Sequence, residues 1–252
     1  MHICICRNIS SIIHPKTCSF IDLLVWKCSD KSEYTKHSVI FISYDLSEFT
    51  CFHIFNSHLR KDSVTANFFY NRPWEDLVVT GIGGTKGKST SAYYMKAVVD
   101  DYMAAQGKKE SAVISSIDIY DGKSLVESHI TTPEAVELPQ HLRNALDCGL
   151  EYAEMEVYSQ ALKYHRVDDM RFDAAIFLNI SEDHISPIEH EDFEDYFTSK
   201  MRMFAKADRA FVNLDADHIE RILTYAKDAN EYFTFSPKNP EADFYAHNNR
   251  KD

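Results

Sequence analysis

Glycine is scarce in this chain: only 7 of its 252 residues are glycine, and none precedes Gly81. Four of the seven, Gly81, Gly83, Gly84 and Gly87, fall within one short stretch. Glycine is the residue that allows left-handed backbone conformations and a close approach of the main chain to a ligand. The sequence therefore concentrates its backbone freedom at one place, which makes that stretch the first candidate for a functional loop.

A surplus of basic charge and long apolar runs are also missing. Lys and Arg number 27 against 39 Asp and Glu, a net charge of −12, and no basic patch stands out, which disfavours nucleic acid and anionic membranes as partners. Apolar-rich runs such as residues 21–26 and 39–42 are far shorter than the roughly 20 residues of a membrane span. No signal-peptide pattern opens the chain. These absences predict a cytoplasmic protein with neither a nucleic-acid nor a membrane partner.

The 6 cysteines lack the CxxC spacing of zinc sites, and nothing indicates a secretory context, so we interpret them as free thiols. Five of them lie in the first 51 residues, so the leading part of the chain differs in composition from the rest. We expect a boundary near residue 65. Residues 1–65 contain a β-like run at 38–44 but give no assignable fold, whereas residues 66–252 form a second domain.

From about residue 71 the pattern alternates between strands and helices, which is typical of βαβ units on a parallel sheet. We predict strands at residues 77–80, 111–119, 152–157, 174–180, 210–214 and 232–235. The predicted helices cover residues 88–105, 133–149, 192–205 and 217–227, the second opened by Pro133. Asp121 and Gly122 form a predicted turn. The predicted fold class is α/β, a mostly parallel sheet flanked by helices.

The glycine-rich loop, residues 81–90 (GIGGTKGKST), lies between a predicted strand and a predicted helix. Backbone N–H groups and a helix N-terminus can converge on phosphate oxygens there. Lys88 would supply a charge for the outer phosphates, and Ser89 or Thr90 a hydroxyl for Mg²⁺. The strict P-loop pattern fails at Ile82, and the dinucleotide fingerprint fails at Lys86. We predict a nucleoside triphosphate site, with a plain glycine turn as the alternative.

Residues 84–90 (GTKGKST) resemble the GTxGK[ST][ST] loop of the Mur ligase family. Further matches follow in the order found in MurE-type enzymes, the UDP-N-acetylmuramoyl-dipeptide ligases: residues 131–134 (TTPE), 155–162 (MEVYSQAL), 166–167, 177–180 (FLNI), 183–184, 196–197 and 200. The resemblance covers roughly residues 68–217 and implies the P-loop-type central ATPase domain. It further implies peptidoglycan synthesis: ATP phosphorylates a carboxylate, and an amino acid's amine attacks the acyl phosphate to form an amide.

The resemblance assigns nucleotide and metal roles to matching positions. Lys88 would act on the transferred phosphoryl group, and Ser89 and Glu156 would hold one Mg²⁺. Lys200 would be a carbamylated lysine that, with His184, positions a second Mg²⁺. The cofactor-binding residues implied are Gly84, Thr85, Lys86, Gly87, Lys88, Ser89, Thr90 and, at the adenine, Asn179. A turn residue at the end of a strand is the alternative for Asn179, and a solvated carboxylate is the alternative for Glu156.

The resemblance also implies contacts with the UDP-linked muramoyl peptide, or a similar carboxylate substrate, at Thr131, Thr132, Ser159 and Arg166. Thr131 and Thr132 stand before Pro133, so a helix cap is an equally good interpretation of these two.

The position of Lys200 within its predicted helix indicates a buried amine. Apolar side chains recur in the predicted helix at Phe193, Tyr196, Phe197, Met201 and Phe204. At about 100° per residue, Lys200 falls in the middle of this apolar stripe. A lysine there should have a partner, and a desolvated neutral amine is what carbamylation requires. The alternative is a lysine whose head reaches along the stripe to solvent.

Two departures from the MurE pattern stand out. The chain has Tyr158-Ser159-Gln160 where that pattern has Ser-Ser-His, and the segment between His184 and Lys200 is longer, with residues 186–190 (SPIEH) in place of Asp-Tyr-His. Both alterations lie near substrate-contact positions. We therefore expect a MurE-like subgroup whose acceptor can differ.

Neither flanking domain of the family can be identified. Residues 1–65 do not show the UDP-binding domain, so a degenerate or misread segment is one interpretation, and Asp252 precedes the C-terminal domain that would carry the amino acid. We expect residues 66–252 to be a C-terminally truncated Mur ligase central domain. The resemblance implies first a cell-wall peptide ligase, and two alternatives stay open: a non-catalytic ATP-binding remnant, and a relative of folylpolyglutamate, poly-γ-glutamate or cyanophycin ligases.

Overall fold

The computed structural model describes residues 26–28, 37–42, 50–54 and 59–246 apart from 184, 187 and 188, with side chains from residue 63 onward. The chain divides into two compact units, residues 1–57 and 58–252. Helix α1 (Leu59–Phe69) opens the second unit, so the boundary expected near residue 65 would cut through that helix.

The first unit contains an antiparallel sheet with the strand order β1-β2-β3. Its strands are β1 (Trp26–Cys28), β2 (His37–Ile42) and β3 (Thr50–Ile54). Strand β2 confirms residues 38–42 of the β-like run that the sequence indicates at 38–44, and residues 43 and 44 lie outside the described residues.

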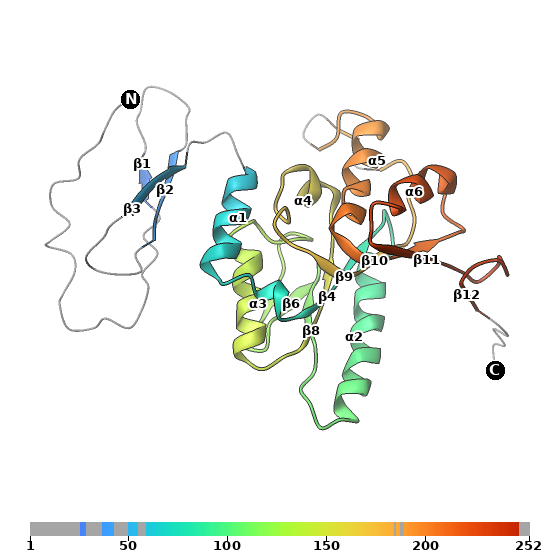
Figure 1. The fold of residues 1–252 in the computed structure, drawn as a ribbon, viewed down its shortest axis with the longest axis horizontal. Coiled ribbons are helices and arrows are strands. Elements are labelled where there is room, and N and C mark those ends of the chain that lie inside the picture. Colours follow the sequence, from blue (N-terminus) through green and yellow to red (C-terminus); the bar gives the residue numbers. More distant parts are fainter. Residues whose placement is uncertain are drawn as a thin grey trace, which may run out of the picture. The chain divides into compact units, whose positions relative to one another are not determined.

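The second unit is built on a nine-stranded sheet with the order β12-β11-β10-β9-β4-β8-β5-β6-β7 (Figure 1). Neighbouring strands from β12 to β5 are parallel, whereas β5, β6 and β7 pair antiparallel. The strands are β4 (Val78–Gly83), β5 (Ala112–Ile114), β6 (Asp118–Tyr120), β7 (Leu125–Glu127), β8 (Tyr152–Glu156), β9 (Phe172–Phe177), β10 (Ala207–Asn213), β11 (Glu231–Ser236) and β12 (Phe244–Tyr245). The predicted α/β class with a mostly parallel sheet is confirmed.

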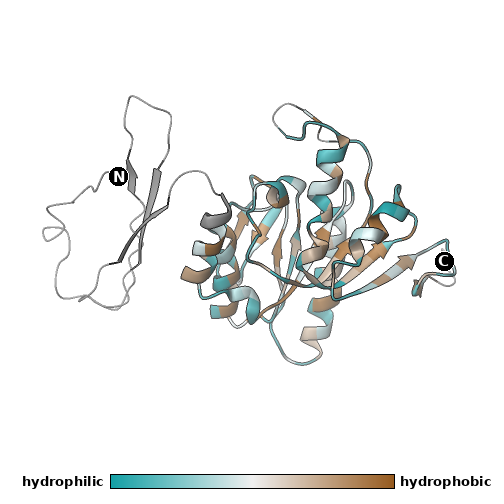
Figure 2. Cartoon of the chain, turned by 45° about the horizontal axis from the view of Figure 1, so that its top comes forward, coloured by the Kyte–Doolittle hydropathy of each residue, from teal (hydrophilic) through white to brown (hydrophobic). Residues whose placement is uncertain are grey.

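Helices pack on both faces of this sheet. They are α1, α2 (Lys88–Ala104), α3 (Glu137–Asp147), α4 (Ser159–Lys163), α5 (Phe193–Met201) and α6 (Ile219–Ala226), with the short 3₁₀ helices η1 (Pro73–Glu75) and η2 (Phe204–Lys206). Val79 belongs to a large hydrophobic cluster with buried residues of α3, α5 and α6, and Ile82 to a small one with Ala92 of α2. Side chains alternate along a strand, so the two clusters cover opposite faces of β4. Figure 2 shows the hydrophobic residues gathered on the strands. Among the described residues, no helix is long and apolar enough to cross a membrane.

The strand predicted at residues 111–119 is two strands, β5 and β6, that fold back on each other. The Ser115 hydroxyl accepts hydrogen bonds at 3.1 Å from both the Ile117 and the Asp118 N–H groups, which stabilises a tight turn between them. The predicted turn after β6 is confirmed, because Asp121 accepts backbone N–H bonds from two following residues and Gly122 has φ +78°.

The helix predicted at residues 133–149 begins later, as α3 at Glu137. Thr132 accounts for the delay, because its hydroxyl donates to the Glu156 carbonyl (2.8 Å) and accepts from the Tyr158 N–H (3.0 Å). These bonds anchor residue 132 beside the end of β8 and leave it no capping role. The predicted end at Gly149 (φ +75°) is confirmed.

Strand β4 lies between β8 and β9 at the centre of the sheet. The chain connects β4 to one side of the sheet through α2 and β5, then crosses from β8 to β9 on the other side. Open α/β sheets bind ligands at the carboxyl ends of the strands beside such a reversal. The glycine-rich loop, Glu156 and Asn179 follow the carboxyl ends of these three strands.

Candidate functional site

The glycine-rich loop turns from β4 into α2, and Asn179 holds its middle in place. The Asn179 Oδ1 atom accepts from the N–H groups of Thr85 (3.1 Å) and Lys86 (2.9 Å), and its Nδ2 donates to the Lys86 carbonyl (3.0 Å). Gly87 precedes α2 with φ +85°, a conformation that favours glycine. The Asn179 amide thus stabilises the loop conformation. The predicted contact of Asn179 with adenine stays a prediction.

Lys88 and Lys200 converge on the same backbone oxygen. The Lys88 Nζ donates to the carbonyls of Gly84 and Thr85, both at 3.1 Å, and the Lys200 Nζ donates to Gly84 at 2.7 Å. Lys200 is only 2% exposed, which confirms the burial and the partner that its helical position predicts and excludes a side chain reaching solvent. Its Nζ also lies 4.8 Å from the centre of the Tyr196 ring.

Burial and a neighbouring amine disfavour the charged forms of both side chains: the neighbour is Lys86 for Lys88, and Lys88 for Lys200. Burial lowers the pKa of Lys88, outweighing the carboxylates of Glu156 and Asp183, which raise it. Burial and the nearby Lys88 lower the pKa of Lys200 well below its usual value, and Asp183 opposes them. The Lys200 amine is therefore the more easily neutralised of the two.

Glu156 ends β8 with a carboxylate that is 1% exposed. Its Oε1 accepts from the Ser116 N–H (2.8 Å) and hydroxyl (3.2 Å), and the Ser116 hydroxyl lies 3.1 Å from the Ser89 hydroxyl. Ser116 thus joins the two predicted metal ligands. Ser116 was not predicted from the sequence, although two serines at the end of a short strand are a weak signal for such a turn.

These oxygens suit a hard divalent cation. Mg²⁺ takes one or two protein ligands together with phosphate oxygens and water, and Ser89 and Glu156 supply a hydroxyl and a carboxylate of that kind. The described residues contain no group of three or more His, Cys, Asp or Glu that could hold a metal by itself. Predicted ligand His184 lies outside the described residues, while the preceding Asp183 is 3.7 Å from the exposed Lys86 amine.

Thr85 joins the loop to α5. Its Oγ1 lies 2.9 Å from the Tyr196 hydroxyl and accepts from the Ser181 N–H at 3.1 Å. Tyr196 is fully buried, and burial raises its pKa to about 12, so the phenol keeps its proton. The apolar stripe predicts the burial of Tyr196, but no pattern in the sequence predicts this contact.

The predicted substrate residues lie next to the chain segment that follows Glu156. Arg166 forms an ion pair with Glu134 (2.6 Å) and donates to the Thr132 carbonyl (3.3 Å). Thr132 and Ser159 have no exposed surface, while Thr131 is half-buried. In this structure the hydroxyls of Thr132 and Ser159 bond to the protein itself.

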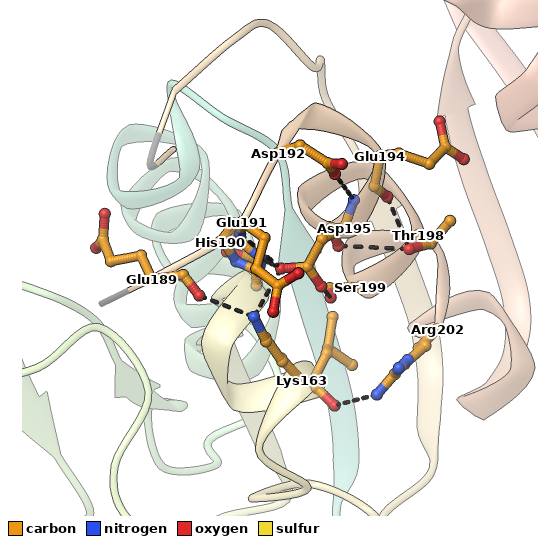
Figure 3. Close-up of polar contacts among 12 residues, drawn as sticks. Lys163, Glu189, His190, Glu191, Asp192, Glu194, Asp195, Thr198, Ser199 and Arg202 are labelled. Atoms are coloured by element: carbon orange, nitrogen blue, oxygen red, sulfur yellow. Dashed lines mark hydrogen bonds and ion pairs between the residues drawn. The ribbon is translucent and has the colours of Figure 1, made fainter. Parts of the chain in front are cut away.

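The Ser159 hydroxyl lies 2.9 Å from Nε2 of His190, and Nδ1 of His190 lies 3.0 Å from Asp195 Oδ2. Lys163 donates to the same Asp195 oxygen at 2.6 Å and to the Glu189 carbonyl at 3.0 Å (Figure 3). We call Ser159, His190, Asp195 and Lys163 the His190 network. It ties α4 to α5 and to the residues that precede α5.

The two departures from the MurE pattern meet in space. The Tyr158 hydroxyl donates to Glu189 Oε1 at 2.9 Å, so the tyrosine that replaces serine contacts the segment that is longer than usual. The contact adds a second link between the start of α4 and the residues before α5.

The structure therefore brings together most of the predicted site. The loop residues, Glu156, Asn179 and Lys200 meet at the carboxyl ends of β4, β8 and β9, and the predicted substrate residues lie beyond Glu156. Thr90 is exposed on the first turn of α2 and shares no hydrogen bond with these groups among the described contacts. Ser116, Tyr196 and His190 are the additions that the structure makes.

Comparisons with known proteins agree with this geometry. The family model "Mur ligase middle domain" matches residues 82–252. The UDP-N-acetylmuramyl-tripeptide synthetase of Bifidobacterium longum is 41% identical over 177 residues, 70% of this chain and 34% of that protein. The UDP-N-acetylmuramoyl-L-alanyl-D-glutamate--L-lysine ligase of Enterococcus faecalis is 41% identical over 157 residues, 62% of this chain and 30% of that protein.

Solved structures share the fold. A UDP-N-acetylmuramoyl-L-alanyl-D-glutamate--2,6-diaminopimelate ligase has a TM-score of 0.60 at 21% identity, covering 73% of this chain and 38% of that one. MurF from Acinetobacter baumannii has a TM-score of 0.53 at 15% identity, covering 81% and 40%. The chain spans about a third of the length of the curated relatives it matches. By the family model, its relatives and its fold, the chain belongs to the Mur ligase family.

Proposed function

We propose that the chain binds Mg²⁺·ATP at the glycine-rich loop and serves as the nucleotide-binding part of a ligase that joins an amino acid to the carboxylate of a UDP-linked muramoyl peptide. The convergence of Lys88 and Lys200 on the Gly84 carbonyl carries the proposal. The Lys88 amine beside a loop of backbone N–H groups forms a site for phosphate charges, and the buried Lys200 amine is the group proposed below to become a carbamate. The relatives, a UDP-N-acetylmuramyl-tripeptide synthetase and a UDP-N-acetylmuramoyl-L-alanyl-D-glutamate--L-lysine ligase, supply the substrate class.

In this site Lys88 would exchange its two carbonyl partners for oxygens of the outer phosphates. The exchange stabilises the negative charge on the transferred phosphoryl group, which is the main task of a phosphoryl-transfer site. Ser89 and Glu156 would hold Mg²⁺, and Ser116 fixes one Glu156 oxygen so that the other can face the metal. When bound, the ion neutralises phosphate charge and keeps the phosphate oxygens in place for transfer.

The chemistry needs two transfers. The acceptor carboxylate oxygen attacks the terminal phosphorus of ATP, which gives an acyl phosphate and ADP. The neutral amine of the amino acid then attacks the acyl carbon, a C–N bond forms, the C–O bond to phosphate breaks, and the amine loses a proton. Burial around Lys88, Lys200 and Glu156 supports this sequence, because the acyl phosphate must be kept from water.

Lys200 is proposed as a carbamate. A neutral amine adds CO₂ to give R–NH–COO⁻ and one released proton, and the buried amine with its lowered pKa meets the first requirement. The new carboxylate would add a hard oxygen ligand beside the loop. His184 is proposed as a ligand of the same second ion.

The proposed acceptor contacts divide into two kinds. Thr131 and the Arg166 guanidinium, which is 15% exposed, are proposed to meet the substrate. Thr132 and Ser159 are buried, and we propose that they act without touching the substrate, by fixing the end of β8 and the start of α4.

The test is a calorimetric titration of the chain with Mg²⁺·ATP, followed by a phosphate-release assay with UDP-N-acetylmuramoyl-L-alanyl-D-glutamate and an amino acid. Saturable binding together with phosphate release that needs both substrates supports a ligase. Because the chain spans about a third of its relatives, nucleotide binding without release is the second candidate, a binding remnant. Absence of Mg²⁺·ATP binding contradicts both.

A further inference from the structure

We propose that His190 is a positioning residue for the glycine-rich loop, acting through Tyr196 on the Thr85 hydroxyl and on Lys200. The inference rests on the proposed nucleotide site and adds to it a link from α4. Every residue in this link is buried: Ser159, His190 and Tyr196 are 0% exposed, Lys200 2% and Thr85 6%.

The first step of the link fixes the His190 ring. Asp195 is an ionised acceptor: burial raises its pKa, but the Lys163 amine, the Glu191 N–H and His190 outweigh burial and lower the pKa to about 2. An acceptor at Nδ1 requires the proton on that nitrogen, so the neutral ring has a bare Nε2 that accepts from the Ser159 hydroxyl. With both nitrogens bonded, the imidazole can neither rotate nor shift without losing a buried hydrogen bond.

The second step passes from His190 to Tyr196. The two ring centres are 5.2 Å apart with an interplanar angle of 69°, an edge-on arrangement. A fixed imidazole therefore limits where the phenol ring can lie. Interiors are close-packed, so a displaced side chain here must displace its neighbours.

The third step reaches the nucleotide site. The Tyr196 hydroxyl contacts Thr85 Oγ1 at 2.9 Å, and the Lys200 Nζ lies over the Tyr196 ring, 4.8 Å from its centre. Lys200 in turn donates to the Gly84 carbonyl. One phenol ring thus touches the loop through its hydroxyl and the Lys200 amine through its face.

Two further contacts hold the residue beside His190 to α4. The Tyr158 hydroxyl and the Lys163 amine both bond to Glu189, which immediately precedes His190. These bonds hold the backbone at the point from which the imidazole projects.

The experiment measures Mg²⁺·ATP affinity calorimetrically for the full chain and for His190→Asn, His190→Gln, Tyr196→Phe and the double variant His190→Asn/Tyr196→Phe. Asn keeps a group at the Nδ1 position toward Asp195, and Gln keeps one at the Nε2 position toward Ser159. We expect each single variant to bind Mg²⁺·ATP about five- to thirtyfold more weakly than the parent chain. The double variant should bind no more weakly than the weaker-binding of its two component single variants, because both residues act through one link.

The matched control is His165→Asn, since His165 also pairs with an aspartate (Asp168, 2.9 Å) but is 40% exposed. It should bind as the parent chain does. Urea unfolding of every variant separates positioning from stability, because a merely structural histidine would lower stability and leave the affinity of the folded chain unchanged. Parent-like affinity in folded His190 variants, or additive losses in the double variant, would overturn the inference.

A second readout needs no nucleotide. Amide hydrogen exchange at Thr85 and Ser181 should accelerate several-fold in the His190 and Tyr196 variants, beyond any global loss of stability, and stay unchanged in His165→Asn. Unaltered exchange in stable variants contradicts the inference even if ATP binds. If the parent chain fails to bind ATP while exchange responds as expected, the proposed nucleotide function is the part that fails.

Discussion

Lys88 and Lys200 donate hydrogen bonds to one carbonyl oxygen, that of Gly84, at 3.1 and 2.7 Å. A charged Lys200 amine would repel a charged Lys88 amine at this distance, and a single carbonyl would compensate only part of that cost. Burial and the nearby Lys88 lower the pKa of Lys200 well below its usual value, so the Lys200 amine gives up its charge more easily. The proposed phosphate at Lys88 and the proposed carbamate at Lys200 would each remove this repulsion.

Replacing Lys88 tests the loop directly. Lys88→Ala removes the cation proposed to meet the outer phosphates, and we expect Mg²⁺·ATP affinity to fall roughly 100-fold or more, since hydrogen bonds to charged groups are the strongest of their kind. Isothermal calorimetry measures the change. Lys108→Ala is the control, because Lys108 pairs with Glu151 on the surface and should leave the affinity unaltered. Equal affinity in Lys88→Ala and the parent chain would remove the loop assignment.

Replacing Lys200 separates stability from binding. Lys200→Met keeps much of the buried volume and no longer requires an amine to be desolvated, so we expect the free energy of unfolding to stay within about 1 kcal/mol of the parent or to rise. Mg²⁺·ATP affinity should nevertheless fall. In ¹³CO₂-equilibrated buffer the parent chain should give a carbamate carbon resonance that Lys200→Met lacks. A resonance of equal intensity in both proteins would discard the carbamate at this position.

Ser116 tests whether the Glu156 carboxylate is held ready for a metal. Ser116→Ala removes the hydroxyl that contacts Glu156 and Ser89 but keeps the backbone N–H bond to Glu156. We expect the Mg²⁺ concentration needed for half-maximal ATP binding to rise roughly tenfold, the usual effect of losing a group that orients a metal ligand. Ser128→Ala, at a hydroxyl that donates to the Ile130 carbonyl, is the control. An unchanged Mg²⁺ requirement would exclude this role for Ser116.

Local signals predicted much of the fold because strand and helix patterns in the second unit are regular. The α/β fold class, the parallel sheet and the burial of Lys200 all follow from the spacing of hydrophobic residues and from the turn-forming residues. The errors arose where a side chain bonds to backbone, either far away in the sequence or within the same turn. Thr132 bonds to the end of β8 and so delays α3, and Ser115 divides one predicted strand into two.

The site was predictable where a motif is contiguous and unpredictable where it depends on packing. Residues 84–90 form one recognisable loop, whereas the Tyr196 hydroxyl reaches Thr85 only because β9 and β4 are neighbours. The contact of Tyr158 with Glu189 joins two departures that the sequence shows separately. No local pattern states that they meet.

The buried carboxyl group of Glu154 should make the free energy of unfolding depend on pH. It lies on β8 with 1% exposure, its Oε2 has no hydrogen-bond partner among the described residues, and burial raises its pKa from 4.5 to about 7. The folded chain thus binds the Glu154 proton more tightly than the unfolded chain does. This contribution to stability is complete below pH 4.5 and is lost as pH rises through about 7, a difference of about 3 kcal/mol.

Glu154→Gln carries no such charge, so its urea-unfolding free energy should exceed that of the parent at pH 8 and approach it near pH 4.5. Glu151→Gln, at a half-exposed carboxylate just before the same strand, is the control for replacing a surface carboxylate. Parallel profiles for the parent and Glu154→Gln between these pH values would show that the buried carboxyl does not titrate in that range.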